Sequence, residues 1–135
     1  MKKILVIICV SILIGSFSVS TVSAEGITLF NNNTLNTNSL FTIKDDGNAI
    51  VIAEYMGYEG ITTNATVKIT IEKRFLLVFW NDVATWTDEV TGYHYSNSYS
   101  TTVKKGTYRA TVEYTICGTR GAADVITDVL EYTYE

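Results

Sequence analysis

The sequence contains no proline, and its 135 residues include only two cysteines and one histidine. Cys9 lies in an apolar N-terminal run that we expect to be removed, so Cys117 would be the single thiol of the mature chain. An intramolecular disulfide is then excluded, and a zinc site is disfavoured because His94 and Cys117 are too few ligands. Without proline, edge strands must be protected from pairing by charged side chains such as Lys68 and Glu113.

The N-terminus has the residue order of a secretory signal peptide. Lys2 and Lys3 precede an uncharged apolar run over residues 4–14, and small or short side chains follow at Val22-Ser23-Ala24. This order predicts cleavage after Ala24 and secretion of the remaining chain. A membrane anchor is the alternative, but 11 apolar residues fall short of the ~20 that a helical span needs. No second apolar run of this kind follows, so we expect no membrane association after cleavage.

Removal of residues 1–24 takes away two lysines and no acids. The mature chain then has 8 basic and 14 acidic residues, a formal net charge of −6. That sign disfavours nucleic acid and an anionic membrane as partners. The charges are also spread along the chain, and Lys104 and Lys105 form the only adjacent lysine pair of the mature part, so no basic patch is expected.

The mature chain divides by composition into two parts. Residues 25–44 are rich in Asn and Thr, so we expect a flexible leader that buries too little apolar surface to offset its ordering entropy. The segment Asp45-Asp46-Gly47-Asn48 has turn chemistry, and it predicts that the ordered domain spans residues 45–135.

The domain has the hydrophobic pattern of strands throughout. Apolar and polar residues alternate over 66–72 and again over 107–116, which is typical of half-buried strands. Residues 75–80 are unbroken apolar, which is consistent with a strand covered on both faces or with an apolar hairpin. Together these patterns predict an all-β fold, an antiparallel β-sandwich of immunoglobulin-like size with about six or seven strands. A barrel is the main alternative.

Candidate catalytic groups are few. Asp88 and Glu89 are adjacent on a predicted strand and should point to opposite faces, so they do not form an acid/base pair. His94 lacks a nucleophile elbow of the Gly-x-Ser-x-Gly type, and Cys117 continues a strand where a buried thiol is the ordinary interpretation. The turn at 45–48 lacks the ligand spacing of a calcium loop. We therefore expect no enzyme activity, no cofactor and no metal.

Aromatic side chains are the best candidates for a binding surface. They could stack on a glycan or anchor a peptide, although a sandwich core also consumes aromatic residues and should take most of them. The candidates are Trp80, Trp86, Tyr93, Tyr95 and Tyr99.

Three segments resemble a family of small secreted proteins from Gram-positive, Clostridium-like bacteria that is classified as a domain of unknown function. They are residues 63–73, the Trp80-x-x-Val83-x-x-Trp86 segment, and residues 103–110 with Gly106, Tyr108 and Arg109. The resemblance covers about residues 48–116. It implies a secreted β-sandwich and carries no implication about activity.

These observations favour a secreted, extracellular, non-enzymatic interaction module that binds a cell-wall glycan or another protein. The alternative is a secreted bacteriocin or toxin-like effector, since small exported β-sandwiches can act on neighbouring cells. A hydrolase is a third alternative, disfavoured by the missing catalytic constellation.

Overall fold

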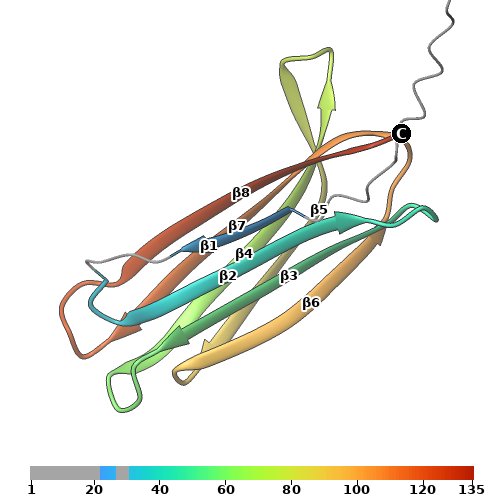
Figure 1. Ribbon diagram of the computed structural model, residues 1–135. Helices are drawn as coiled ribbons and strands as arrows, with labels where there is room; N and C mark the ends of the chain where they lie inside the picture. The colour runs from blue at the N-terminus through green and yellow to red at the C-terminus, as the bar shows by residue number, and fades with distance from the viewer. Residues whose placement is uncertain (1–21, 27–30) are drawn as a thin grey trace, which may run out of the picture.

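The computed structural model describes residues 22–26 and 31–135, and within them the chain forms two four-stranded antiparallel sheets (Figure 1). The strand order is β1-β2-β3-β6 in the first sheet and β5-β4-β7-β8 in the second. The all-β sandwich expected from the sequence is thereby confirmed. The strands are β1 (Val22–Gly26), β2 (Thr34–Ile43), β3 (Asn48–Gly57), β4 (Thr62–Phe75), β5 (Phe79–Thr91), β6 (His94–Thr102), β7 (Gly106–Gly118) and β8 (Asp124–Tyr134).

The core lies between the sheets and follows the period-two pattern of the sequence. On β4 the inward side chains of Val67, Ile69 and Ile71 are fully buried, and on β7 those of Tyr114 and Val112 are buried opposite the first two. Fully burying a side chain of this kind contributes about 1.5–3 kcal/mol, so these alternating positions supply much of the driving force for the fold.

The expected flexible leader over residues 25–44 is wrong for its larger part. Residues 34–43 form β2, which pairs with β3 along its length and buries Phe41 and Ile43 in the core. Composition was misleading here because the inward positions are spaced two apart, and Thr37 and Ser39 occupy two of them at 2% and 0% exposure. The ordered sandwich therefore includes Thr34 and does not begin at Asp45.

The predicted signal peptide lies mostly outside the described residues. Its last three residues belong to β1, which pairs with β2 in the register Val22↔Phe41 to Gly26↔Thr37. Among the residues that the structure describes, none forms a helix with the length and apolar character of a membrane span.

One hairpin extends beyond the rest of the sandwich. The C-terminal end of β4 and the start of β5 run past the neighbouring strands and form a projecting loop at one end of the molecule (Figure 1). The last paired residues of this hairpin are Phe75 and Phe79.

Candidate functional site

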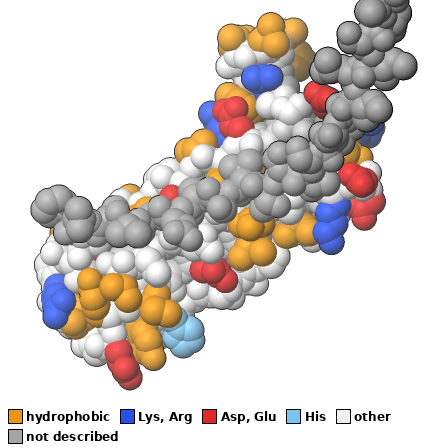
Figure 2. All heavy atoms as spheres, viewed as in Figure 1, with side chains coloured by type: hydrophobic (Ala, Val, Ile, Leu, Met, Phe, Trp, Pro, Cys, Tyr) orange, Lys and Arg blue, Asp and Glu red, His pale blue; other side chains and the backbone are white. Residues whose placement is uncertain are grey.

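The projecting hairpin ends in five consecutive exposed apolar side chains, which we call the hairpin tip. Across the described part of the chain ten large hydrophobic side chains are exposed, and half of them lie in this one segment. Figure 2 shows them as a continuous apolar cap. The residues and their exposed fractions are Phe75 54%, Leu76 69%, Leu77 82%, Val78 70% and Phe79 60%.

The backbone of the tip adopts a conformation that its residues disfavour. Leu76 and Leu77 have φ angles of 48° and 68°, and they are the only non-glycine residues with positive φ in the described residues. They are the first two residues of the three-residue loop between the paired Phe75 and Phe79, and positive φ is a conformation that Asn and Gly adopt far more readily than leucine does. Each leucine here costs about 1 kcal/mol or more in backbone strain. Fold stability alone does not explain why leucines occupy this turn.

Below the tip, the successive cross-strand pairs of the hairpin contain polar and charged side chains. Arg74 is paired with Trp80, and Lys73 with Asn81. The guanidinium of Arg109, on β7, lies over the Trp80 ring at 4.3 Å, and its Nη2 is 2.7 Å from a Glu72 carboxylate oxygen. Trp80, one of the aromatic candidates, is therefore held at the base of the tip.

Three of the other aromatic candidates come together at the edge of the sandwich where β5 faces β6. The rings of Trp86 and Tyr99 lie 5.2 Å apart, and Tyr95 stacks on Tyr55 with ring centres 5.9 Å apart. All three are half-buried and pack against the core, so they do not form an open platform. The fifth candidate, Tyr93, lies in the β5–β6 turn with its ring edge against His94.

Asp88 joins the two sheets at this edge. Its Oδ2 accepts hydrogen bonds from the Tyr95 hydroxyl at 2.7 Å, from Asn97 Nδ2 at 3.1 Å and from the Tyr99 hydroxyl. We call these four side chains the Asp88 latch. As the sequence predicted, Asp88 and Glu89 point to opposite faces, and Glu89 instead accepts from Thr66 on the outer surface.

The electrostatics of the latch are those of a structural contact. The hydrogen bonds from Tyr99 and Tyr95 lower the pKa of the Asp88 carboxyl, which keeps it charged at neutral pH. Burial, followed by the hydrogen-bond and charge interactions with its neighbours, raises the pKa of Tyr95, and burial is also the largest cause of the raised pKa of Tyr99. A carboxylate held in its charged form beside neutral phenols is poorly suited to act as a general acid.

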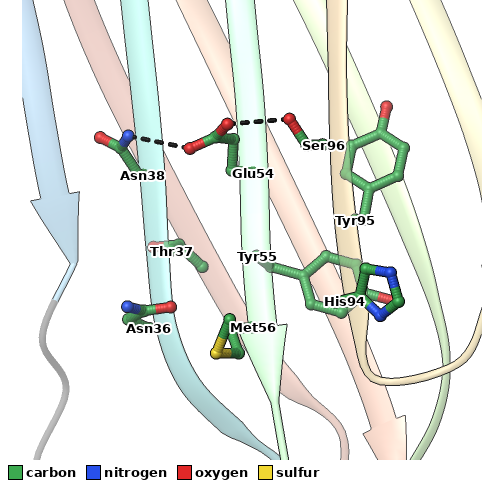
Figure 3. A pocket seen from close by; sticks show the side chains of 9 residues that line it. All are labelled: Asn36, Thr37, Asn38, Glu54, Tyr55, Met56, His94, Tyr95 and Ser96. Carbon is green, nitrogen blue, oxygen red and sulfur yellow. Dashed lines mark hydrogen bonds between the residues drawn. The ribbon is translucent and has the colours of Figure 1, made fainter.

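A second surface feature lies on the outer face of β2, β3 and β6. It is a shallow hollow of ≈ 440 Å³ (Figure 3), in which Glu54 accepts a hydrogen bond from Asn38 on one side and from Ser96 on the other. The next cross-strand row consists of Asn36, Met56 and His94. The two carboxylate oxygens of Glu54 are already paired with neighbouring side chains. Thr37 also lines the hollow, and its buried Oγ1 has no hydrogen-bond partner in the described part of the chain.

The two remaining reactive side chains lie on different sheets. His94 begins β6 opposite Met56, whereas Cys117 lies near the end of β7 opposite Asn64. In residues 22–26 and 31–135, no three His, Cys, Asp or Glu side chains gather in a way that could hold a metal ion.

Comparison of the chain with protein-family models, with curated proteins and with solved structures found no match. The hairpin tip therefore stands as the candidate site on its geometry. In the sequence this site is marked by an apolar run between two strand arms, with no Gly, Asn or Asp to indicate a turn. The interpretation of residues 75–80 as an apolar hairpin is confirmed.

Proposed function

We propose that this chain is a secreted, non-enzymatic binding module that docks through its hairpin tip. The observation that carries the proposal is the placement of five exposed apolar side chains on a projecting turn that two of them strain. Apolar patches of this kind on soluble proteins mark interaction sites. Strain retained at an exposed turn is typical of functional segments.

The tip favours an apolar target over a cell-wall glycan. Its side chains offer no hydrogen-bonding group to sugar hydroxyls over five consecutive positions. The aromatic rings expected to stack on a glycan, those of Trp86, Tyr95 and Tyr99, pack inward against the core. Burial of the tip side chains in an apolar partner would contribute about 1.5–3 kcal/mol for each residue fully covered.

Secretion is the part of the proposal that rests on the sequence. Cleavage after Ala24 would divide β1 and leave only Glu25 and Gly26 of that strand. The three β2 positions that pair with residues 22–24 would then form an uncovered sheet edge, on a strand that has no charged residue to discourage pairing. N-terminal sequencing of the protein recovered from culture medium tests this, with Glu25 as the expected first residue and an intact Met1 as the contradicting result.

Attachment to bacterial cells tests the docking role. The variant Leu76→Asn/Leu77→Gly removes two apolar side chains and places residues that tolerate positive φ at the two strained positions, so it should fold at least as well as the wild type. We expect the wild type to be retained on intact cells of related bacteria and this variant to be lost on washing. Val125→Asn removes an equally exposed side chain, 72% accessible on β8, and should be retained. Equal retention of all three proteins would refute the docking role of the tip.

A toxin-like effector remains the second candidate because the same tip would serve a protein that acts on the surface of neighbouring cells. Growth inhibition of related strains by the purified protein, lost in the Leu76→Asn/Leu77→Gly variant, would support it. Full growth at every concentration would contradict it.

Membership of the secreted family that the sequence resembles is likewise a proposal, supported by Trp80 and Trp86 as matched positions.

A further inference from the structure

We infer that the partner of the hairpin tip is a lipid bilayer, into whose interfacial region the tip inserts. The inference rests on the proposed docking role and adds the chemical class of the target. It reverses the expectation of no membrane association after cleavage, which was drawn from the absence of a second long apolar run. A strand hairpin needs no such run because it enters only the outer few ångströms of the bilayer.

The dimensions of the tip match the interfacial region. From the turn at Leu77 back to the Phe75–Phe79 pair the hairpin advances two residues, and a strand rises about 3.4 Å per residue, so the apolar cap is about 7 Å deep. Amphipathic elements that bind at membrane interfaces bury their apolar face by about 5–10 Å. Strand pairing continues as far as Phe75 and Phe79, which lowers the cost of placing the backbone of this segment away from water.

The residues directly below the cap suit the headgroup level. Trp80 and Arg74 form the next cross-strand pair, followed by Lys73 and Asn81. Tryptophan is enriched at membrane interfaces because its ring is apolar and its N–H is polar, and basic side chains at this depth reach the lipid phosphates. The polarity of the hairpin therefore changes in the order of a bilayer surface, from hydrocarbon through the interface to water.

Charge is distributed along the molecule in a way that favours this orientation. The turn between β2 and β3 and the loop between β6 and β7 lie at the hairpin end, joined by a hydrogen bond from Val103 N to Gly47 O at 2.8 Å. Six of the eight mature basic residues lie here: Lys44, Lys73, Arg74, Lys104, Lys105 and Arg109. Six acids share this end: Asp45, Asp46, Glu72, Asp82, Glu131 and Glu135. The hairpin end is thus neutral, and the net charge of −6 belongs to the rest of the domain, which an anionic surface would repel.

A bilayer fits the tip better than a second copy of the chain does. The hollow along β2, β3 and β6 is lined by Tyr55, Met56 and Tyr95, but it is also crossed by the hydrogen-bonded polar row of Asn38, Glu54 and Ser96. Five apolar side chains would cover that row without offering it a hydrogen-bonding group. The tip is also convex and projects freely (Figure 1), a shape that a fluid hydrocarbon phase accommodates without a preformed pocket.

Tryptophan fluorescence gives a local readout. The chain has two tryptophans, so the Trp86→Phe variant leaves Trp80, at the base of the tip, as the single reporter. With vesicles of phosphatidylcholine, and of phosphatidylcholine mixed with phosphatidylglycerol, we expect its emission to shift to the blue and to be quenched by brominated acyl chains. The Trp80→Phe variant, which retains Trp86 beside the core, should show no shift. An unchanged Trp80 emission in a protein that sediments with vesicles would refute insertion of the tip.

Co-sedimentation with the same vesicles separates this inference from the docking role. We expect Leu76→Asn/Leu77→Gly to lower the partition coefficient by about tenfold to a hundredfold, as loss of one or two buried leucines implies, while Val125→Asn leaves it unchanged. Binding only to the phosphatidylglycerol vesicles and abolished by salt would indicate surface electrostatics and refute insertion. Tip-dependent attachment to cells without any vesicle binding would refute the bilayer and preserve the docking role in favour of a protein partner. Absence of tip dependence in both assays would refute both.

Discussion

Tyr114→Phe tests the polar bridge that joins the two sheets through the core. Tyr114 lies on β7 and is fully buried, and its hydroxyl reaches across to the other sheet. The phenolic oxygen accepts from the Glu54 N–H at 3.2 Å, and its one proton is shared between Ser39 Oγ at 2.8 Å and the Asn38 carbonyl at 3.2 Å. Ser39 in turn donates to Asp128 Oδ2 at 2.6 Å, so the bridge ends on a buried carboxylate.

Removal of one oxygen atom eliminates one donated and one accepted hydrogen bond at about 1 kcal/mol each, and the ring still fills its space. The free energy of unfolding should therefore fall by about 2 kcal/mol. With a urea slope of about 2 kcal/mol per molar, the unfolding midpoint should fall by about 1 M. Tyr134→Phe is the matched control, because it loses a single exposed hydrogen bond to the Asp45 carbonyl and should shift the midpoint very little. A Tyr114→Phe midpoint equal to that of the control would refute the energetic role of the bridge.

Alkaline unfolding provides a second readout of the same residue. Burial raises the pKa of Tyr114 to about 12, so the folded state holds this proton when the unfolded state has already released it. Stability from this group is complete below about pH 10, the ordinary value for tyrosine, and is lost as pH rises toward 12. Tyr114→Phe should flatten that part of the stability curve, and an unchanged slope would contradict the assignment.

Three further changes test other parts of the structure. Asp88→Asn should lower the free energy of unfolding by about 1–3 kcal/mol at neutral pH. Because folding lowers the pKa of this carboxyl, the difference from wild type should shrink below about pH 4, and a difference that stays constant with pH would contradict the role of the Asp88 latch. Asp124→Ala removes the buried acceptor for the Asn33 N–H and the Thr34 hydroxyl, so a loss of about 3 kcal/mol and faster hydrogen exchange of the Asn33 amide are expected. Unchanged exchange would argue against this anchor. Leu76→Asn/Leu77→Gly should raise the free energy of unfolding by about 1 kcal/mol through relief of positive-φ strain, and a destabilised variant would contradict the backbone strain at these two positions.

Much of the fold could be predicted from the sequence because buried and exposed positions of a strand alternate, and this alternation is visible as a two-residue period of apolar and polar residues. The alternation over residues 107–116 matches the buried and half-buried positions of β7. The turn expected at 45–48 is present, with Gly47 at a φ of 81° and Asn48 N bonded to Asp46 Oδ1 at 2.9 Å. The prediction of a flexible leader was wrong for two reasons. The Asn and Thr content of this segment obscured a set of inward-facing positions that ends in two buried apolar residues, and the side chain that anchors the segment, Asp124, is distant in sequence.

The candidate site was less accessible to sequence reasoning. An apolar run such as residues 75–80 has the same composition whether it is a buried strand or an exposed turn, and only the strand pairing of Phe75 with Phe79 distinguishes the two. The aromatic residues posed the converse difficulty. Tyr95 and Tyr99 alternate with serines as a surface strand would, but β6 lies at an open edge where its inward face reaches Asp88 of the other sheet.

The most direct test of the central claim is the partition of two proteins, the wild type and Leu76→Asn/Leu77→Gly, between buffer and phosphatidylcholine vesicles. We expect the wild type to sediment with the vesicles and the variant, although more stable, to stay in the supernatant. Equal partition of the two proteins, bound or unbound, would contradict insertion of the hairpin tip.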